Sequence, residues 1–127
     1  MNATAKTFLV VSALLALSSI ILGTIAAHAP SEQLLAAKHW FDTAMQYQQF
    51  HALALFGVGL MMAHWPSRAF AAAGWLMILA TLLFSGTLYQ RSMLGYHDLH
   101  WLTPYGGWAY LAGWIALIVG VIKARRA

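Results

Sequence analysis

The residues of this chain that could do chemistry are polar side chains set inside otherwise apolar segments. Tyr47, Gln48 and His51 lie within the run FDTAMQYQQFHALALF, which covers residues 41–56. A histidine in such a place could accept a proton near neutral pH or bind a metal ion. Buried polar groups are costly in an apolar environment unless they find hydrogen-bond partners. The rest of the chain must therefore supply those partners.

Composition places these residues in a membrane protein. Hydrophobic residues make up 61% of the chain and charged residues 8%, against about 45–50% and about 25% in soluble domains. The charged residues leave charge-free windows at 7–31, 43–67, 69–90 and 99–122. Each window exceeds the roughly 20 residues that a membrane-spanning helix needs. We therefore expect an all-α integral membrane protein.

The expected fold is an up-down-up-down four-helix bundle, formed as a single domain by residues 1–127. Its spans are predicted at about 7–28, 43–63, 69–90 and 103–123. Pro30 ends the first span, and Ser31 can cap a short interfacial helix that precedes the second span. The alternative for the first segment is a cleaved signal peptide with Ala27-His28-Ala29 as its cleavage site. That alternative is disfavoured because the apolar run exceeds the usual length of about 7–15 residues.

The basic residues indicate how the spans are oriented. One side of the predicted membrane segments holds Lys6, Arg68, Lys123, Arg125 and Arg126. The other side holds only Lys38 and Arg91, together with all of the acidic residues. The positive-inside rule then predicts a multi-pass protein of the bacterial inner membrane with both termini in the cytoplasm. Because the basic residues lie at helix ends and form no stripe, the expected partner is the lipid bilayer and not nucleic acid.

Small residues recur at alternating intervals of three and four along the first and fourth spans. The stripes are Ser12, Ala16, Ser19, Gly23 and Ala26, and Gly106, Ala109, Gly113, Ala116 and Gly120. Such stripes are typical of closely packed membrane helices that cross near +20°. The glycines expected at helix contacts are Gly23, Gly86, Gly106, Gly107, Gly113 and Gly120.

The predicted topology gathers polar side chains in the outer half of the bundle. The members are His28, Tyr47, Gln48, His51, Ser85, Tyr89 and Thr103. In one interpretation they hydrogen-bond one another and fix the register of the helices. In the other they line a cavity that opens outward and binds a ligand.

Metal or haem chemistry is a further alternative for the histidines. The chain has six His and no Cys, so disulfides and thiolate sites are excluded. His97 and His100 have a spacing that suits zinc or copper, but no third ligand is assured. Bis-histidine haem would need His28 and His51 at equal depth, and residue counting separates them by about two helical turns. We expect no metal and no cofactor.

No pattern of catalytic residues accompanies the polar cluster. The acidic residues Glu32, Asp42 and Asp98 lie in outer loops or at a helix start, where capping or solvation explains them. The sequence has no Ser/His/Asp set, no phosphate-binding loop and no carboxylate inside a span. Ion-coupled transporters usually need intramembrane carboxylates or broken helices. The chain is therefore not expected to be an enzyme.

Several stretches resemble one known family. They are LGTIAAHA (22–29), FDTAMQYQQFHALALF (41–56), LLFSGTLY (82–89) and LTPYGGWAYLAGW (102–114). This pattern is similar to the bacterial and mitochondrial membrane family called domain of unknown function 423, or transmembrane protein 256-like. The family usually has a Gly-Ala-Phe-Gly-like run before the first His, where this chain has Gly23-Thr24-Ile25-Ala26. The resemblance implies a small integral inner-membrane protein without an assigned activity.

Apart from Pro104, which follows Thr103 at the start of the fourth span, the motif residues of that family coincide with residues singled out above. They are His28, Tyr47, Gln48, His51, Ser85, Gly86, Tyr89, Thr103, Pro104, Gly106 and Gly107. Our leading hypothesis is a non-enzymatic protein that forms a homo-oligomer or serves as an accessory subunit of a larger membrane complex. The alternative is a binder or transporter of a small molecule, lipid or ion that uses the polar cluster around His51.

Overall fold

The structure is a computed structural model that describes residues 1–96 and 98–125. Every regular element in that part of the chain is helical. The long helices are α1 (Ala3–His28), α3 (Lys38–His64), α4 (Arg68–Tyr89) and α5 (Thr103–Lys123). The shorter elements are α2 (Glu32–Ala36), a π-helical turn (Gln90–Leu94) and a 3-10 turn (His100–Leu102). The prediction of an all-α protein is confirmed.

Within the described residues, three helical runs are long and apolar enough to cross a membrane: Ala3–His28, Arg68–Leu94 and His100–Lys123. They contain the first, third and fourth predicted spans. Helix α3 is not among them, although its 27 residues exceed the roughly 20 that a span requires. Its glutamines and His51 lower its hydropathy, so apolarity alone does not confirm the predicted span at 43–63. Whether α3 can lie in lipid depends on how its polar side chains are paired.

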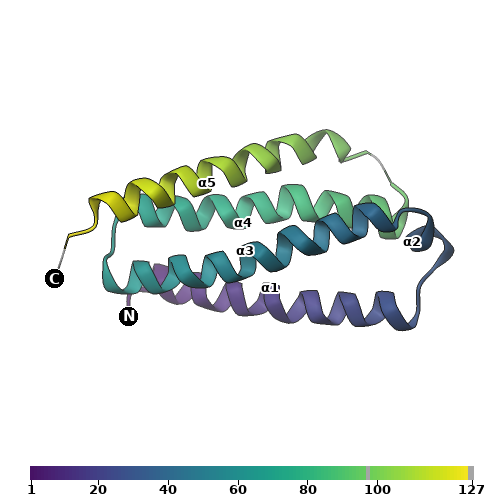
Figure 1. Ribbon diagram of the computed structural model, residues 1–127, viewed down its shortest axis with the longest axis horizontal. Coiled ribbons are helices and arrows are strands. Elements are labelled where there is room, and N and C mark those ends of the chain that lie inside the picture. The colour runs from purple at the N-terminus through teal and green to yellow at the C-terminus, as the bar shows by residue number, and fades with distance from the viewer. Residues whose placement is uncertain (97, 126–127) are drawn as a thin grey trace.

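The long helices lie side by side in the order α1, α3, α4, α5 (Figure 1). The start of α1, the α3–α4 turn and the end of α5 lie at one end of the molecule. Helix α2 and the α4–α5 connection lie at the other end (Figure 1). The extensive contacts are those of α1 with α3, α3 with α4 and α4 with α5. The helices form an open row, in which α5 packs on α4 and meets α3 mainly through side chains.

Helices α4 and α5 pack with large residues of one against glycines of the other. The facing pairs are Phe84 with Gly106, Met77 with Gly113, and Phe70 with Gly120. A Cβ atom at Gly106 would lie 2.5 Å from the backbone nitrogen of Phe84, and one at Gly120 would lie 2.7 Å from the Phe70 ring. Both sets recur every seven residues along the sequence, the repeat of a shallow left-handed crossing. The glycines of α5 thus let the backbones of the two helices approach closely.

The other glycines expected at contacts are less closely packed. A Cβ atom at Gly86 or Gly107 would meet nothing within 4 Å, and one at Gly23 would meet only the end of the Met45 side chain, at 3.9 Å. None of these three positions needs glycine for close packing, since an added methyl group fits at each.

Two of the contacts that α1 makes are at Gly59 and Gly74, glycines that were not predicted to lie at helix contacts. The Phe8 ring lies directly against Gly74 of α4, and Leu9 lies against Gly59 of α3, where a Cβ atom would come within 2.8 Å of its side chain. Phe8 is fully buried and belongs to a core that includes Leu55, Val58, Ala73 and Met77. The apolar core therefore lies toward the end of the row that holds the α3–α4 turn.

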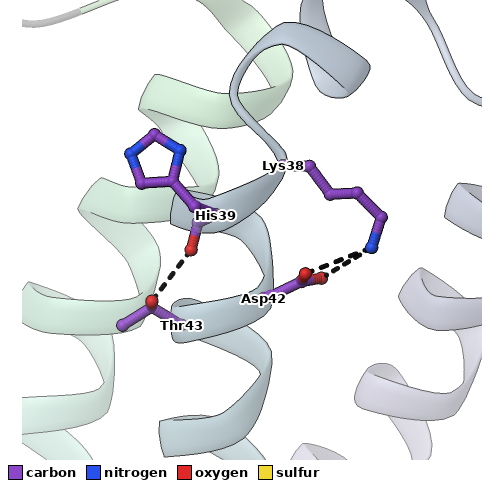
Figure 2. A network of polar contacts seen from close by, with 4 residues as sticks. All are labelled: Lys38, His39, Asp42 and Thr43. Carbon is purple, nitrogen blue, oxygen red and sulfur yellow. Dashed lines mark hydrogen bonds and ion pairs between the residues drawn. The ribbon is translucent and has the colours of Figure 1, made fainter.

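The opposite end of α3 carries charge. Lys38 Nζ lies 3.1 Å from Asp42 Oδ2, one turn along the helix, and both side chains are exposed (Figure 2). Thr43 donates its hydroxyl to the carbonyl oxygen of His39 at 2.8 Å (Figure 2). Just before α3, the Ser31 hydroxyl accepts from the Leu34 amide at 3.1 Å and caps α2. An exposed pair of this kind stabilises little, but it marks where α3 leaves the apolar region.

Candidate functional site

Gln48 of α3 is a buried polar residue that forms hydrogen bonds to both neighbouring helices, α1 and α4. It is 3% exposed, and its amide nitrogen donates to the carbonyl oxygen of Leu15 and to the hydroxyl of Ser18, both at 2.9 Å. The amide oxygen accepts from the Tyr89 hydroxyl. A backbone carbonyl can only accept, so the amide nitrogen must face α1 and the oxygen must face α4. One side chain thereby joins α1, α3 and α4.

A second link between α3 and α4 lies beside the first. The Ser85 hydroxyl donates to the backbone carbonyl of Ala44 at 2.9 Å, and both residues are buried. The Tyr89 ring packs edge-on against Phe41 with 5.5 Å between centroids. Gln48, Ser85 and Tyr89 thus form one set of contacts on the side of α3 that faces its neighbours α1 and α4.

His51 belongs to a different set, which faces α5. Its Nδ1 lies 2.8 Å from the carbonyl oxygen of Tyr47, and its Nε2 lies 3.0 Å from the indole nitrogen of Trp114. The carbonyl can only accept and the indole can only donate, so Nδ1 carries the proton and Nε2 accepts. Both ring nitrogens therefore have hydrogen-bond partners within the protein, and a metal ion at Nε2 would have to displace Trp114.

Tyr110 fixes the imidazole from the side. Its ring stacks on His51 with centroids 3.7 Å apart and planes inclined by 21°. Its hydroxyl donates to Thr81 at 3.0 Å, and Thr81 in turn donates to the carbonyl oxygen of Met77 at 2.9 Å. Tyr110 and Trp114 were not singled out from the sequence. Their spacing of one helical turn could have indicated them, because it places both on one face of α5. Each also has a polar end that needs a hydrogen-bond partner when it is buried.

The remaining predicted members lie apart from these two sets. Thr103 meets Thr87 with 2.6 Å between hydroxyl oxygens, which ties the start of α5 to α4. His28 is exposed at the end of α1 and joins neither set. The structure therefore divides the predicted cluster: Gln48 and Tyr89 lie on one side of α3, and His51 lies on the other.

The geometry of the described histidines does not support the zinc, copper or haem alternatives. His97 lies outside the described residues, and His100 faces Arg91, whose Nη1 is 3.1 Å from the imidazole Nδ1. No group of three potential ligands occurs among residues 1–96 and 98–125. His28 and His51, the pair considered for haem, belong to different environments.

A groove of about 720 Å³ lies between α3 and α5 beside the His51 set. Its walls include Tyr47, Phe50 and His51 from α3 and Trp108, Leu111 and Trp114 from α5. The volume falls in the range of about 300–1,000 Å³ typical of small-molecule sites. Phe50 is 59% exposed and Trp108 69% exposed, so the groove is open along the outer surface of the row. It exists because α5 packs on α4 and leaves its aromatic side chains to reach toward α3.

These features define a class of protein. In its described residues, the protein has three apolar helices of spanning length, and its polar side chains are paired between helices. Both features are typical of a small helical membrane protein. The chain belongs to the family described as protein of unknown function (DUF423), whose family model matches residues 22–107. The predicted family resemblance is confirmed. The matched range contains all of α3 and α4 and ends at the first turns of α5, before Tyr110 and Trp114.

Relatives from several bacteria match nearly the whole chain. The UPF0382 inner membrane protein YgdD of Escherichia coli K12 is 33% identical over 124 residues, which cover 97% of this chain and 95% of the relative. A UPF0382 membrane protein of Haemophilus influenzae is 37% identical over 93% of this chain and 95% of its own length. The UPF0382 membrane protein YwdK of Bacillus subtilis is 34% identical over 93% and 98%. No solved structure matches. The predicted membrane location is confirmed by these relatives.

Proposed function

We propose that α3 is a fourth membrane span and that the chain crosses the inner membrane four times, up, down, up and down. The support is the pairing of its polar side chains: Gln48 with α1 and α4, and His51 with α5. Polar groups in lipid are tolerated where neighbouring helices supply their partners. Lys6 lies near the start of α1, Arg68 at the start of α4 and Lys123 at the end of α5. These helix ends lie at the same end of the row (Figure 1), so the positive-inside rule directs both termini to the cytoplasm.

Within that membrane protein, we propose that the α3–α5 groove binds an amphipathic or apolar molecule taken from the bilayer, without catalysis. The observation that carries this proposal is the groove itself, whose aromatic walls are held in place by hydrogen bonds. Since His51 and Tyr110 are already paired within the protein, the groove offers ring faces and hydrocarbon to a ligand. Exposed Gln46, which also lines the groove near the charged start of α3, can bind a polar end group. The expected ligand is therefore a chain or ring system with one hydrogen-bonding end.

A homo-oligomer or an accessory subunit is the second candidate. The open row favours it, because α1 and α5 are the outer members and many large apolar side chains are exposed on the long helices. However, membrane helices associate mainly through small residues, and the small-residue stripe of α5 is used against α4 within the chain. The exposed surface that remains consists largely of bulky side chains, which suit lipid as well as protein. We therefore place this candidate after the binding function.

Two glycine positions allow a matched test of the binding function. Gly107 lines the groove and Gly86 does not, yet a Cβ atom meets nothing within 4 Å at either position. Leucine at Gly107 should fill the groove, and leucine at Gly86 should leave it open. Both variants should fold, because leucine is a better helix former than glycine.

The measurement is energy transfer from the groove tryptophans to a dansyl-labelled fatty acid in detergent solution. The wild-type protein and Gly86→Leu should show saturable transfer, and Gly107→Leu should weaken the apparent affinity at least tenfold. Equal saturable transfer in all three proteins, or only linear partitioning, would contradict the binding function. Native mass spectrometry of the same samples tests the second candidate: a stable multimer whose mass is unaffected by Gly107→Leu, together with absent fatty acid binding, would favour assembly.

A further inference from the structure

A second hollow lies at the end of the row opposite the charged start of α3. It has a volume of about 450 Å³ and is formed by the α3–α4 turn and the end of α5. Its lining includes Trp65, Pro66, Ser67, Arg68, Lys123 and Arg125. These two segments are far apart in the sequence and meet at the same end of the molecule (Figure 1).

The packing of α4 against α5 builds this hollow. The Ser67 hydroxyl accepts from the Phe70 amide at 3.1 Å and starts α4 at Arg68. The Phe70 ring then lies against Gly120, where a Cβ atom would be 2.7 Å away. That contact holds the last turn of α5, with Lys123, beside the start of α4. The basic side chains are thus brought together by a buried contact between helices.

The charge of the hollow has one sign. Arg68, Lys123 and Arg125 all line it and are exposed. The chain has three acidic residues, and none of them lines the hollow. They are Glu32, Asp42 and Asp98, which lie at α2, at the start of α3 and in the α4–α5 connection. Three positively charged side chains therefore surround one concave surface.

We propose that this hollow binds the phosphate headgroup of an anionic phospholipid of the adjacent leaflet. Arginine and lysine bind phosphate oxygens by charge-assisted hydrogen bonds, and basic pockets between membrane helices bind acidic headgroups. Trp65 also lines the hollow and is exposed, and tryptophans are enriched at the level of the headgroups. Phe70 and Val119 line the hollow on its apolar side, where the first carbons of the acyl chains fit. The inference requires this end of the row to lie at a membrane surface and is independent of what occupies the α3–α5 groove.

The competing explanation is a diffuse positive charge that sets topology and binds no particular lipid. Lys6 provides the control, because it lies near the start of α1 at the same end of the row but does not line the hollow. The variants are Arg68→Gln, Lys123→Gln and Lys6→Gln, each of which removes one exposed positive charge. Thermal unfolding without added lipid checks that each variant folds.

The experiment measures the rise in melting temperature of the detergent-solubilised protein as short-chain phosphatidylglycerol is added, since a ligand of the folded state stabilises it. Arg68→Gln and Lys123→Gln should each weaken the apparent affinity by about fivefold, and Lys6→Gln should change it less than twofold. Phosphatidylcholine and inorganic phosphate should give no comparable stabilisation at the same concentration. An equal loss in Lys6→Gln would overturn the site in favour of diffuse charge. Equal stabilisation by phosphatidylcholine or by inorganic phosphate would overturn the assignment to an anionic lipid.

Discussion

The Tyr89 hydroxyl of α4 donates its hydrogen to the side-chain oxygen of Gln48 in α3. Because the same amide donates to Leu15 and Ser18 of α1, Tyr89 and α1 are connected through a single buried residue. A glutamine can therefore lie in the middle of α3 without an unpaired polar group. This link is the physical basis for placing α3 in the membrane.

The first prediction concerns the amide of Gln48. Gln48→Leu keeps the volume roughly constant but leaves the hydroxyl of half-buried Tyr89 without its oxygen acceptor. The free energy of unfolding in mixed micelles should fall by about 1–3 kcal/mol. Gln49→Leu is the matched control. Gln49 is exposed and its amide is 3.5 Å from Ser19, so the change should stay within about 0.5 kcal/mol.

The second prediction concerns the pair Gln48 and Tyr89. A double-mutant cycle with Gln48→Leu and Tyr89→Phe should give a coupling energy of about 0.6 kcal/mol, and at most about 1.7 kcal/mol, the mean and the maximum for interhelical hydrogen bonds in membranes. Unfolding in mixed micelles measures all four proteins under one condition. Additive effects of the two substitutions would show that the hydrogen bond contributes nothing to stability.

The third prediction concerns the contact between α4 and α5. Gly106→Ala should destabilise the protein by about 1–3 kcal/mol through overpacking, because the new methyl group would lie 2.5 Å from the Phe84 backbone. Gly107→Ala, one residue along, should be neutral or slightly stabilising, since its methyl group meets nothing within 4 Å and alanine favours helix. Melting temperatures of the two variants provide the comparison. Equal destabilisation would mean that Gly106 does not face α4.

The fourth prediction concerns the tautomer of His51. The ¹⁵N spectrum of labelled protein should show a protonated Nδ1 and an unprotonated Nε2, because Tyr47 offers a carbonyl and Trp114 an N–H group. Trp114→Phe removes the only hydrogen bond described to Nε2, so the Nε2 resonance should shift while that of Nδ1 is nearly unchanged. A proton on Nε2 in the wild-type protein would refute the arrangement of His51, Tyr110 and Trp114.

The sequence was sufficient to locate the long helices and to identify residues that need partners. Charge-free windows and Pro30 gave α1, α4 and α5 to within a few residues, because ionic side chains are excluded from the interior of a membrane. Gln48 and His51 were selected because burying them requires hydrogen bonds. Both are 3% exposed in the structure, as that reasoning expected.

The identity of the partners could not be predicted, because it depends on the rotation and neighbour order of the helices. The stripe of Gly106, Gly113 and Gly120 indicated a packing face but not which helix covers it. Phe70 and Phe84, at the same seven-residue repeat in α4, were the missing signal. The rotation of α5 about its axis could not be inferred, so Tyr110 and Trp114 were not connected with His51, and the groove between α3 and α5 was not predicted as the place for a ligand.

The central claim is that α3 crosses the membrane despite its polar residues, and cysteine accessibility tests it most directly. The chain has no cysteine, so single cysteines can be placed at exposed Glu32, before α3, and at exposed His64, at its end. An impermeant maleimide applied to intact cells should label Glu32→Cys at once and His64→Cys only after the cells are opened. Labelling of both positions from the same side of the membrane would contradict a spanning α3.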